Sequence, residues 1–332
     1  MDLKGEFKAR VPLIEEEIES YINADMKPAE LYAPLVDLMA RGGKRVRPVI
    51  CMIACEAVGG DQKKAIKTSA AIEMIHNFTL VHDDIVDGSD LRRGKKCLHH
   101  IYGLDLTINA GDGLFSRSYE LLHHNFEVLN PEKSLEIFGL LSTSVTKICE
   151  GQAMDISWSK NRRWDITEND YFEMLMRKTG ILISTACECG AIIGKASDEE
   201  REALRVFGME IGKAFQIHDD VLNLLGDEEN YGKEIGGDIN EGKRTIIVID
   251  TLGKCSPEEK KRLIEILDKE SNNQEEIREA LLILKKYGAI ERASKLAEDL
   301  VDNAKTQLEV LPNKHGKEIL LALADYFIQR KK

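Results

Sequence analysis

The sequence is poor in helix-breaking residues and lacks the signatures of several protein classes. Only seven prolines occur in 332 residues, and β-branched residues rarely alternate with polar ones, so we expect no substantial β-sheet. No run of about 18 apolar residues is present, so we expect no membrane-spanning segment. The first twenty residues are charged and lack the apolar core of a signal peptide.

Cysteine usage and charge exclude further classes. The seven cysteines are an odd number without a CxxC pair, which predicts reduced thiols in a cytoplasmic protein rather than disulfides or zinc sites. The formal net charge of −12 argues against a nucleic-acid partner. The chain has no GxxxxGK[ST] loop and no GxGxxG after a strand, which disfavours nucleotide chemistry of those types.

Helical periodicity runs along most of the chain. Hydrophobic residues make up 43% of the sequence, and in residues 278–311 they recur every three or four positions. Ser256 and Pro257 followed by glutamates form a helix-start signal. We predict an all-α fold of ten or more helices in a single domain, residues 1–332, although the length leaves a division into two domains open. Breaks are predicted at Gly42–Gly43, Gly59–Gly60, Asn130–Pro131, 158–168, 226–243 and Pro312.

One short stretch, "LVHDDIVDGSDLRRG" at residues 80–94, gathers several carboxylates. On a helix Asp83 and Asp87 lie one turn apart on the same face, and Asp84 is rotated away from them. Like charges at this spacing repel each other, and a divalent cation between them reverses the sign of the interaction. Magnesium suits such a site, because it binds hard oxygen ligands and completes its shell with water and phosphate. A solvated acidic helix face is the alternative.

A second aspartate pair occurs in "QIHDDVLN", residues 216–223. Asp219 and Asp220 follow an apolar helical stretch, as the first group does. The residue four positions after Asp219 is Asn223, a neutral oxygen donor, so we expect Asp219 to make most of the metal contacts there. The predicted magnesium ligands are therefore Asp83, Asp84, Asp87 and Asp219.

Basic residues flank both aspartate groups. "RGGKRVRP", residues 41–48, places Lys44, Arg45 and Arg47 after a glycine pair, and guanidinium and ammonium groups together suit diphosphate oxygens. Taken alone, this stretch could be a basic turn that only improves solubility. Further basic residues are Arg92, Arg93, Lys178, Lys233 and Lys243, the last two in a glycine-rich stretch, residues 231–245, that we interpret as a flexible phosphate-covering loop.

The motifs in their order resemble those of the trans-isoprenyl diphosphate synthases, over almost the whole chain. The matching stretches are "GGKRVRP", "IHNFTLVHDDIVDGSDLRRG", "INAGD", "GQAMD", "KTG", "FQIHDDVLNLLGD", "GKEIGGDINEGKRT" and "YFIQR". The pattern is closest to short-chain members that make geranylgeranyl diphosphate. Two departures are Asn223, where a third aspartate is usual, and Glu234, where proline is common.

The resemblance implies a reaction and an assembly. Such prenyltransferases of isoprene biosynthesis condense isopentenyl diphosphate with an allylic diphosphate (dimethylallyl, geranyl or farnesyl) by magnesium-assisted ionisation, condensation and elimination. They are helical bundles around a central substrate cavity and work as homodimers or higher homo-oligomers. We therefore expect several Mg²⁺ ions per active site and the two diphosphates as substrates.

The resemblance also assigns roles to individual residues. Isopentenyl diphosphate is expected on Lys44, Arg47, His76 and Arg93. The allylic diphosphate is expected on Arg92, Lys178, Thr179, Gln216, Lys233 and Lys243, of which Lys178, the Thr179 backbone oxygen and Gln216 are also expected to stabilise the allylic cation. A lone histidine on an amphipathic helix can instead be a core residue, and this alternative stays open for His76.

Product length is expected to depend on the residues below the first aspartate group. Thr79, four residues before Asp83, is small and lies on the same helical face, whereas Phe78, five before, is bulky but rotated away from that face. This pattern resembles that of enzymes with farnesyl to geranylgeranyl products. We expect geranylgeranyl diphosphate, with farnesyl diphosphate as the alternative. Rival interpretations are a terpene cyclase, a non-catalytic subunit of a heteromeric synthase and a metal-dependent diphosphatase.

Overall fold

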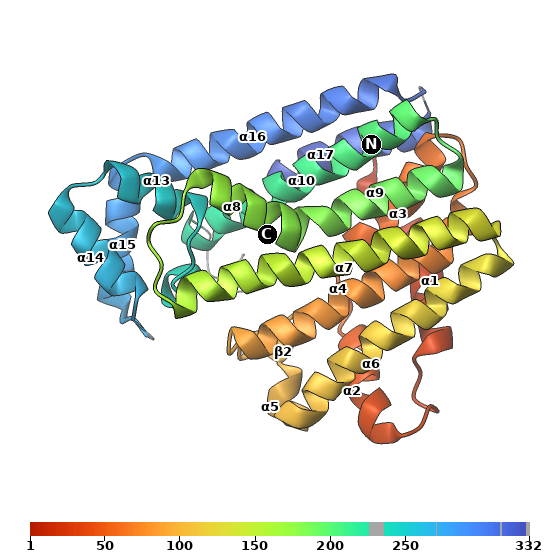
Figure 1. Cartoon of the computed structure of the whole chain (residues 1–332), viewed down its shortest axis with the longest axis horizontal. Helices are drawn as coiled ribbons and strands as arrows, with labels where there is room; N and C mark the ends of the chain where they lie inside the picture. Colours follow the sequence, from red (N-terminus) through yellow and green to blue (C-terminus); the bar gives the residue numbers. More distant parts are fainter. Residues whose placement is uncertain (226–235, 270, 313, 330–332) are drawn as a thin grey trace. The chain divides into compact units, whose positions relative to one another are not determined.

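Helices form nearly all of the regular structure of this protein. The computed structural model describes residues 1–225, 236–269, 271–312 and 314–329 (Figure 1). The strands described there are β1 (Leu91–Arg92) and β2 (Lys95–Lys96), which pair as one short antiparallel hairpin. The prediction of an all-α fold is therefore confirmed. Within these ranges no helix is long and apolar enough to cross a membrane.

The chain groups into two compact units. The first comprises residues 1–145, 182–206 and 307–323, and the second comprises residues 146–181, 207–306 and 324–332. The helices α7 (Pro131–Lys160), α10 (Asp198–Leu225) and α17 (His315–Gln329) contribute residues to both. The prediction of one domain over residues 1–332 stays a prediction.

Each unit has its own set of helices. The first contains α1 (Leu3–Tyr21), α2 (Ala29–Ala40), α3 (Val46–Ala57), η1 (Gln62–Ala65), α4 (Ile66–Val86), α5 (Leu98–Tyr102), α6 (Leu104–His123), η2 (His124–Glu127), η4 (Leu308–Val310) and nearly all of α9 (Ile181–Gly194). The second contains α8 (Glu168–Leu175), the π-helical turn η3 (Met176–Gly180), α12 (Gly237–Asn240), α13 (Ile246–Lys254), α14 (Pro257–Leu267), α15 (Gln274–Lys286) and nearly all of α16 (Ala289–Gln307).

Helix α4 is the central helix of the first unit. It packs against α1, α3 and α6, and Figure 1 shows α4 and α6 running side by side. Its residues from Thr68 to Ile75 are buried on every side, which is why apolar and small side chains follow one another there, with Glu73 as the one charged exception. Burial decreases in the last turn, where Asp83 is partly exposed and Asp87 is exposed. The fold thus holds the first aspartate group at the end of a firmly packed helix.

The helices of the second unit begin where the sequence supplies caps. Ser256 accepts a hydrogen bond from the backbone of Glu259 at the start of α14, with Pro257 in the first turn, so this predicted helix start is confirmed. Thr167 and Asp170 form a capping box at the start of α8. A separate apolar core fills this unit; its largest buried members include Trp158, Tyr171, Met174, Ile217, Leu263, Ile266 and Ile290.

Candidate functional site

The first aspartate group stands at the C-terminal end of α4. Asp83 lies in the last turn and Asp87 is the C-cap, with its backbone N–H donating to the Asp83 carbonyl over 2.8 Å. The C-terminus of a helix carries partial negative charge, so carboxylates there are disfavoured. No basic residue occupies this last turn. A bound cation would stabilise carboxylates at this location, and the magnesium roles of Asp83 and Asp87 stay predictions.

Asp84 differs from its neighbours. Its side chain is buried, and its Oδ1 accepts hydrogen bonds from Arg92, one of them from Nε over 2.8 Å. Arg92 lies in β1, so the ion pair ties the hairpin to the end of α4. The predicted roles of Asp84 in metal binding and of Arg92 in diphosphate binding stay predictions.

The carboxylates of Asp83 and Asp87 suit a metal ion that needs few protein ligands. Among the residues with described positions, no three His, Cys, Asp or Glu side chains are grouped so that they could hold a metal ion. Magnesium often uses one or two carboxylates and completes its shell with water and substrate phosphate. Asp83 and Asp87, one turn apart with accessible side chains, match that requirement.

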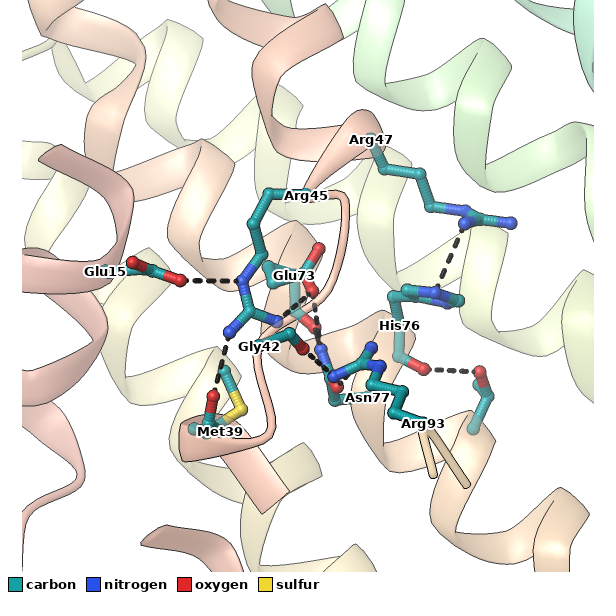
Figure 2. A network of polar contacts seen from close by, with 10 residues as sticks. Glu15, Met39, Gly42, Arg45, Arg47, Glu73, His76, Asn77 and Arg93 are labelled. Atoms are coloured by element: carbon teal, nitrogen blue, oxygen red, sulfur yellow. Dashed lines mark hydrogen bonds and ion pairs between the residues drawn. The ribbon is translucent and has the colours of Figure 1, made fainter. Parts of the chain in front are cut away.

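The basic turn before α3 directs its side chains to different environments. Lys44 is exposed and Arg47 is partly buried, whereas Arg45 is buried with a positive φ of 49°. Figure 2 shows Arg45 pointing toward Glu73, and its Nη1 donates to Glu73 over 2.8 Å. Arg45 is therefore held by the fold, and Lys44 and Arg47 remain as the candidates for ligand binding.

Arg47 and His76, both predicted to bind isopentenyl diphosphate, lie together. The distance between Arg47 Nη1 and His76 Nε2 is 3.2 Å (Figure 2). Desolvation, followed by the charges of Arg47 and Arg93, lowers the pKa of His76 well below its usual value. The ring is therefore neutral near pH 7, and Nε2 accepts the hydrogen bond from Arg47.

Arg93 stands at the tip of the β1–β2 hairpin. Arg93 and Gly94 both have positive φ values, 54° and 74°, as the central residues of a type I′ turn require. Arg93 Nη1 donates to the carbonyl of Gly42, and Nη2 lies 3.4 Å from the Asn77 side-chain oxygen (Figure 2). The hairpin thus places Arg93 against the glycine pair that precedes Lys44.

The two chain-length candidates point in different directions, as helical geometry predicts. Phe78 is buried, and its ring centroid lies 4.8 Å from that of Phe115 on α6. Phe115 in turn lies 4.9 Å from Tyr119, so the aromatic contact continues along α6. Thr79 is partly exposed, and its hydroxyl donates to the carbonyl of His76 over 2.8 Å.

In the second unit, the "RKTG" stretch forms the π-helical turn η3 between α8 and α9. Such turns insert an extra residue into a helix and often mark functional sites. Lys178 Nζ donates to Asp155 of α7 over 2.5 Å. Gly151 permits this approach, because a Cβ at that position would come within 2.5 Å of the Lys178 backbone nitrogen.

A chain of polar contacts joins Thr179 to the second aspartate pair. Thr179 Oγ1 lies 3.4 Å from Gln216 Oε1, and Gln216 Nε2 donates to Asp220 over 3.0 Å. Tyr171 donates its hydroxyl to the other Asp220 oxygen over 3.0 Å. Burial, followed by the charge of Asp238, raises the pKa of Asp220 to about 8. Asp219 is partly exposed, which agrees with its selection as the metal-binding member of the pair.

Asn223 has a structural function in the second unit. Its side-chain oxygen accepts from the backbone N–H of Asp238 over 3.1 Å, and its carbonyl accepts from Gly236 over 2.9 Å. This explains why an amide can stand at a position where the resemblance expects aspartate. Lys243 pairs with Glu241 at 2.5 Å, whereas Lys233 lies outside the described residues.

Known proteins are similar to this chain in both sequence and fold. A model of the polyprenyl synthetase family matches residues 28–284. The chain is 41% identical to a short chain isoprenyl diphosphate synthase of Methanothermobacter thermautotrophicus, over 96% of both chains. The structure of a geranylgeranyl pyrophosphate synthetase from Pyrococcus horikoshii matches with a TM-score of 0.93 at 37% identity, over 99% of this chain and 98% of that one.

The chain belongs to the polyprenyl synthetase family. It is therefore an enzyme that transfers prenyl groups, and the predicted family and enzyme class are confirmed. Another similar structure of this family is a geranylgeranyl pyrophosphate synthase from Corynebacterium glutamicum, complexed with isoprenyl diphosphate and magnesium. That structure has a TM-score of 0.86 and 25% identity, over 99% of this chain and all of that one.

Sequence reasoning did not single out four polar residues that contact the candidate site residues. Asp155 holds Lys178, and Tyr171 holds Asp220. Glu73 and Asn77 are buried polar residues of α4; Glu73 bonds Arg45 and Asn77, and Asn77 contacts Arg93. A charged or amide side chain within an apolar helical stretch was the available signal, because buried polar groups require partners.

Proposed function

We propose that this polyprenyl synthetase condenses isopentenyl diphosphate with an allylic diphosphate and releases geranylgeranyl diphosphate. One observation carries the proposal: the first unit has a basic group, Lys44, Arg47, His76 and Arg93, in addition to the aspartates of α4. A lyase or hydrolase acting on one diphosphate needs only one such binding group. Two substrates that each carry a diphosphate need two.

The proposed role of the aspartates is to bind the allylic substrate through magnesium. Asp83 and Asp87 of the first unit would hold magnesium, and Asp219 of the second unit would hold it as well. When bound, the ion would supply Lewis-acid stabilisation of the leaving diphosphate. Arg92 of the first unit would bind diphosphate oxygens, as would Lys178 and Lys243 of the second unit. Lys233, proposed for the same role, lies outside the described residues. The magnesium in the Corynebacterium structure, together with the hard oxygen donors of this chain, supports the choice of ion.

The basic group binds isopentenyl diphosphate without metal. Lys44, Arg47 and Arg93 neutralise its charge, and neutral His76 keeps Arg47 in place by accepting its hydrogen bond. Fixed alignment of the double bond with the allylic carbon supplies much of the rate. The Thr179 backbone oxygen and the Gln216 side-chain oxygen stabilise the developing positive charge through fixed dipoles. The Lys178 ammonium, itself a cation, acts on the diphosphate. The released diphosphate accepts the proton, so no protein base is required.

Phe78 limits product length in this proposal. Its ring is buried and supported by Phe115, so it is a rigid obstacle to a growing apolar chain. The name of the Pyrococcus enzyme supports a geranylgeranyl product. Farnesyl diphosphate as the main product is the alternative.

The enzyme works as a homodimer. Apolar side chains at the start of α6 are exposed, namely Leu104, Leu106 and Ile108. A second copy of the chain would bury them and gain about 25 cal/mol for each Å² of apolar surface removed from water.

One assay tests the proposal. The purified protein is incubated with Mg²⁺, labelled isopentenyl diphosphate and dimethylallyl, geranyl or farnesyl diphosphate, and the extracted alcohols are sized. We expect geranylgeraniol with each primer. Cyclic hydrocarbons formed without isopentenyl diphosphate would indicate a terpene cyclase, release of phosphate alone would indicate a diphosphatase, and no product would indicate a non-catalytic subunit.

A further inference from the structure

The side-chain amide of Asn77 is held in one orientation. Asn77 is fully buried in α4, and its Nδ2 donates to the Glu73 carboxylate over 2.7 Å and to the Glu73 carbonyl over 2.8 Å. A carboxylate accepts hydrogen bonds and a guanidinium only donates them. The amide nitrogen must therefore face Glu73, and the amide oxygen is left to face Arg93, from which it lies 3.4 Å (Figure 2).

Glu73 is itself fixed. It is buried, and its Oε1 accepts from Nη1 of the buried Arg45 over 2.8 Å. Arg45 also donates to the carbonyl of Met39 over 3.0 Å and pairs with Glu15 at 3.3 Å (Figure 2). A charge-assisted pair with further hydrogen bonds inside the protein is rigid. The orientation of the Asn77 oxygen is thus determined by the buried side chains of Glu73 and Arg45.

Gly42 and Gly43 also contact the guanidinium of Arg93, in addition to Asn77. The carbonyl of Gly42 accepts from Arg93 Nη1. A Cβ on Gly43 would lie 2.9 Å from the Arg93 guanidinium carbon and 2.9 Å from its Nη2. The guanidinium therefore rests directly on the backbone at Gly43, a place that no other residue type leaves open.

We propose that Asn77 is a positioning residue for isopentenyl diphosphate: its amide oxygen, oriented by Glu73, and the bare backbone of Gly43 hold Arg93 ready to bind the diphosphate. This inference rests on the proposed function of Arg93. It adds that Asn77 sets the affinity for isopentenyl diphosphate without contacting it and leaves the allylic substrate unaffected.

Steady-state kinetics of Asn77→Leu tests this positioning role. Each substrate is varied at a saturating concentration of the other. Loss of one hydrogen bond to a charged group is expected to raise KM for isopentenyl diphosphate about ten- to a hundredfold. The KM for the allylic substrate and kcat are expected to stay within about twofold of the wild-type values. The Asn125→Leu variant is the matched control, because Asn125 is a buried amide that bonds Thr68 in the same unit.

A double-mutant cycle separates positioning from a general structural effect. In an Arg93→Ala background, Asn77→Leu is expected to add nothing to KM for isopentenyl diphosphate, since the group it positions is gone. An equal effect in both backgrounds, or the same kinetics for Asn77→Leu and the Asn125 control, would overturn the inference. If Arg93→Ala alone leaves this KM unchanged, the proposed role of Arg93 is wrong and the inference falls with it.

A second variant keeps the proposal testable if Asn77→Leu does not fold. Gly43 lies in an exposed turn, so Gly43→Ala disturbs Arg93 without altering the core, and KM for isopentenyl diphosphate is expected to rise. Gly103→Ala is its control, because Gly103 also has a positive φ, 82°, and a Cβ there meets nothing within 4 Å. Equal kinetics for the two glycine variants would contradict the proposed support of Arg93.

Discussion

Neighbouring residues of the same charge have different environments in this protein. Asp83 is accessible and Asp84 is buried against Arg92, and Asp219 and Asp220 differ in the same way. Lys44 faces solvent and Arg45 faces Glu73. In each pair one side chain is more exposed, and the other is buried with polar partners inside the fold.

Asp83→Asn is expected to lower kcat by about a hundredfold or more, because a neutral amide binds magnesium weakly and the leaving diphosphate loses stabilisation. The measurement is the rate of product formation over a range of Mg²⁺ concentrations. Asp90→Asn is the control, since Asp90 is an exposed aspartate nearby that pairs with His100. Equal rates for the two variants would remove Asp83 from the metal site.

Phe78→Ala is expected to lengthen the product beyond geranylgeranyl diphosphate and to cost about 3 kcal/mol of stability, because a buried ring that contacts Phe115 is removed. Chromatography of the extracted alcohols gives the product length, and urea unfolding gives the stability. Phe126→Ala serves as the control, because Phe126 is 47% exposed. An unchanged product distribution would show that Phe78 does not limit elongation.

Among the helices, α7 and the π-helical turn η3 show how close packing positions a functional residue. Lys178 lies on η3 and pairs with Asp155 of α7, and this is possible because α7 has no side chain at Gly151. The backbone contact and the ion pair therefore depend on each other.

Gly151→Ala is expected to destabilise the protein by about 1–3 kcal/mol, because the new Cβ meets backbone atoms that cannot move aside. The substitution should also lower activity, because the new Cβ displaces the backbone that carries Lys178. The Gly139→Ala variant of the same helix meets nothing within 4 Å, and helix propensity predicts that it stabilises by up to about 1 kcal/mol. Thermal unfolding of the two variants distinguishes them, and equal melting temperatures would contradict the packing argument.

Glu259 of α14 links this helix to the end of α15, and its carboxyl group titrates in acid. Hydrogen bonds from Lys286 and Tyr287 lower the pKa of Glu259 to about 2. A lowered pKa contributes stability that is present above the usual value of 4.5 and is lost as the pH falls toward 2. The Glu259→Gln variant is therefore expected to lose less free energy of unfolding than the wild type between these pH values.

Urea unfolding at pH 6 and pH 3 measures this effect. Glu258→Gln makes the same change of charge at an exposed neighbouring position and is the control. The expectation fails if the Glu259 and Glu258 variants lose stability equally on acidification.

For the chain as a whole, the exposed apolar residues of α6 bear on assembly. We expect a particle of about twice the 37.4 kDa chain mass by light scattering. Replacing both Leu104 and Ile108 by glutamate is expected to give monomers, because two buried unpaired charges oppose association. Leu282→Glu, at a 69% exposed leucine of α15, is expected to leave the mass unchanged. A wild-type monomer would contradict the dimer.

Much of the fold could be predicted because its signals are local. Helix starts at Pro131 and after Ser256 follow from capping and the fixed φ of proline. The π-helical turn and the β1–β2 hairpin were not predicted. Both are short backbone irregularities that depend on contacts with other segments, and the spacing of apolar residues carries little information about them.

The amino-acid sequence by itself determined the family, the helical class and the residue types that suit diphosphate and magnesium, because each of these depends on the order of residues along the chain. The tertiary structure alone decided which member of each pair is buried. Asp84, Arg45 and Asn223 each bond a partner that helical periodicity does not identify, namely Arg92, Glu73 and the backbone of Asp238. Such partners are chosen by packing, since a buried polar group must be satisfied by whatever the fold places beside it.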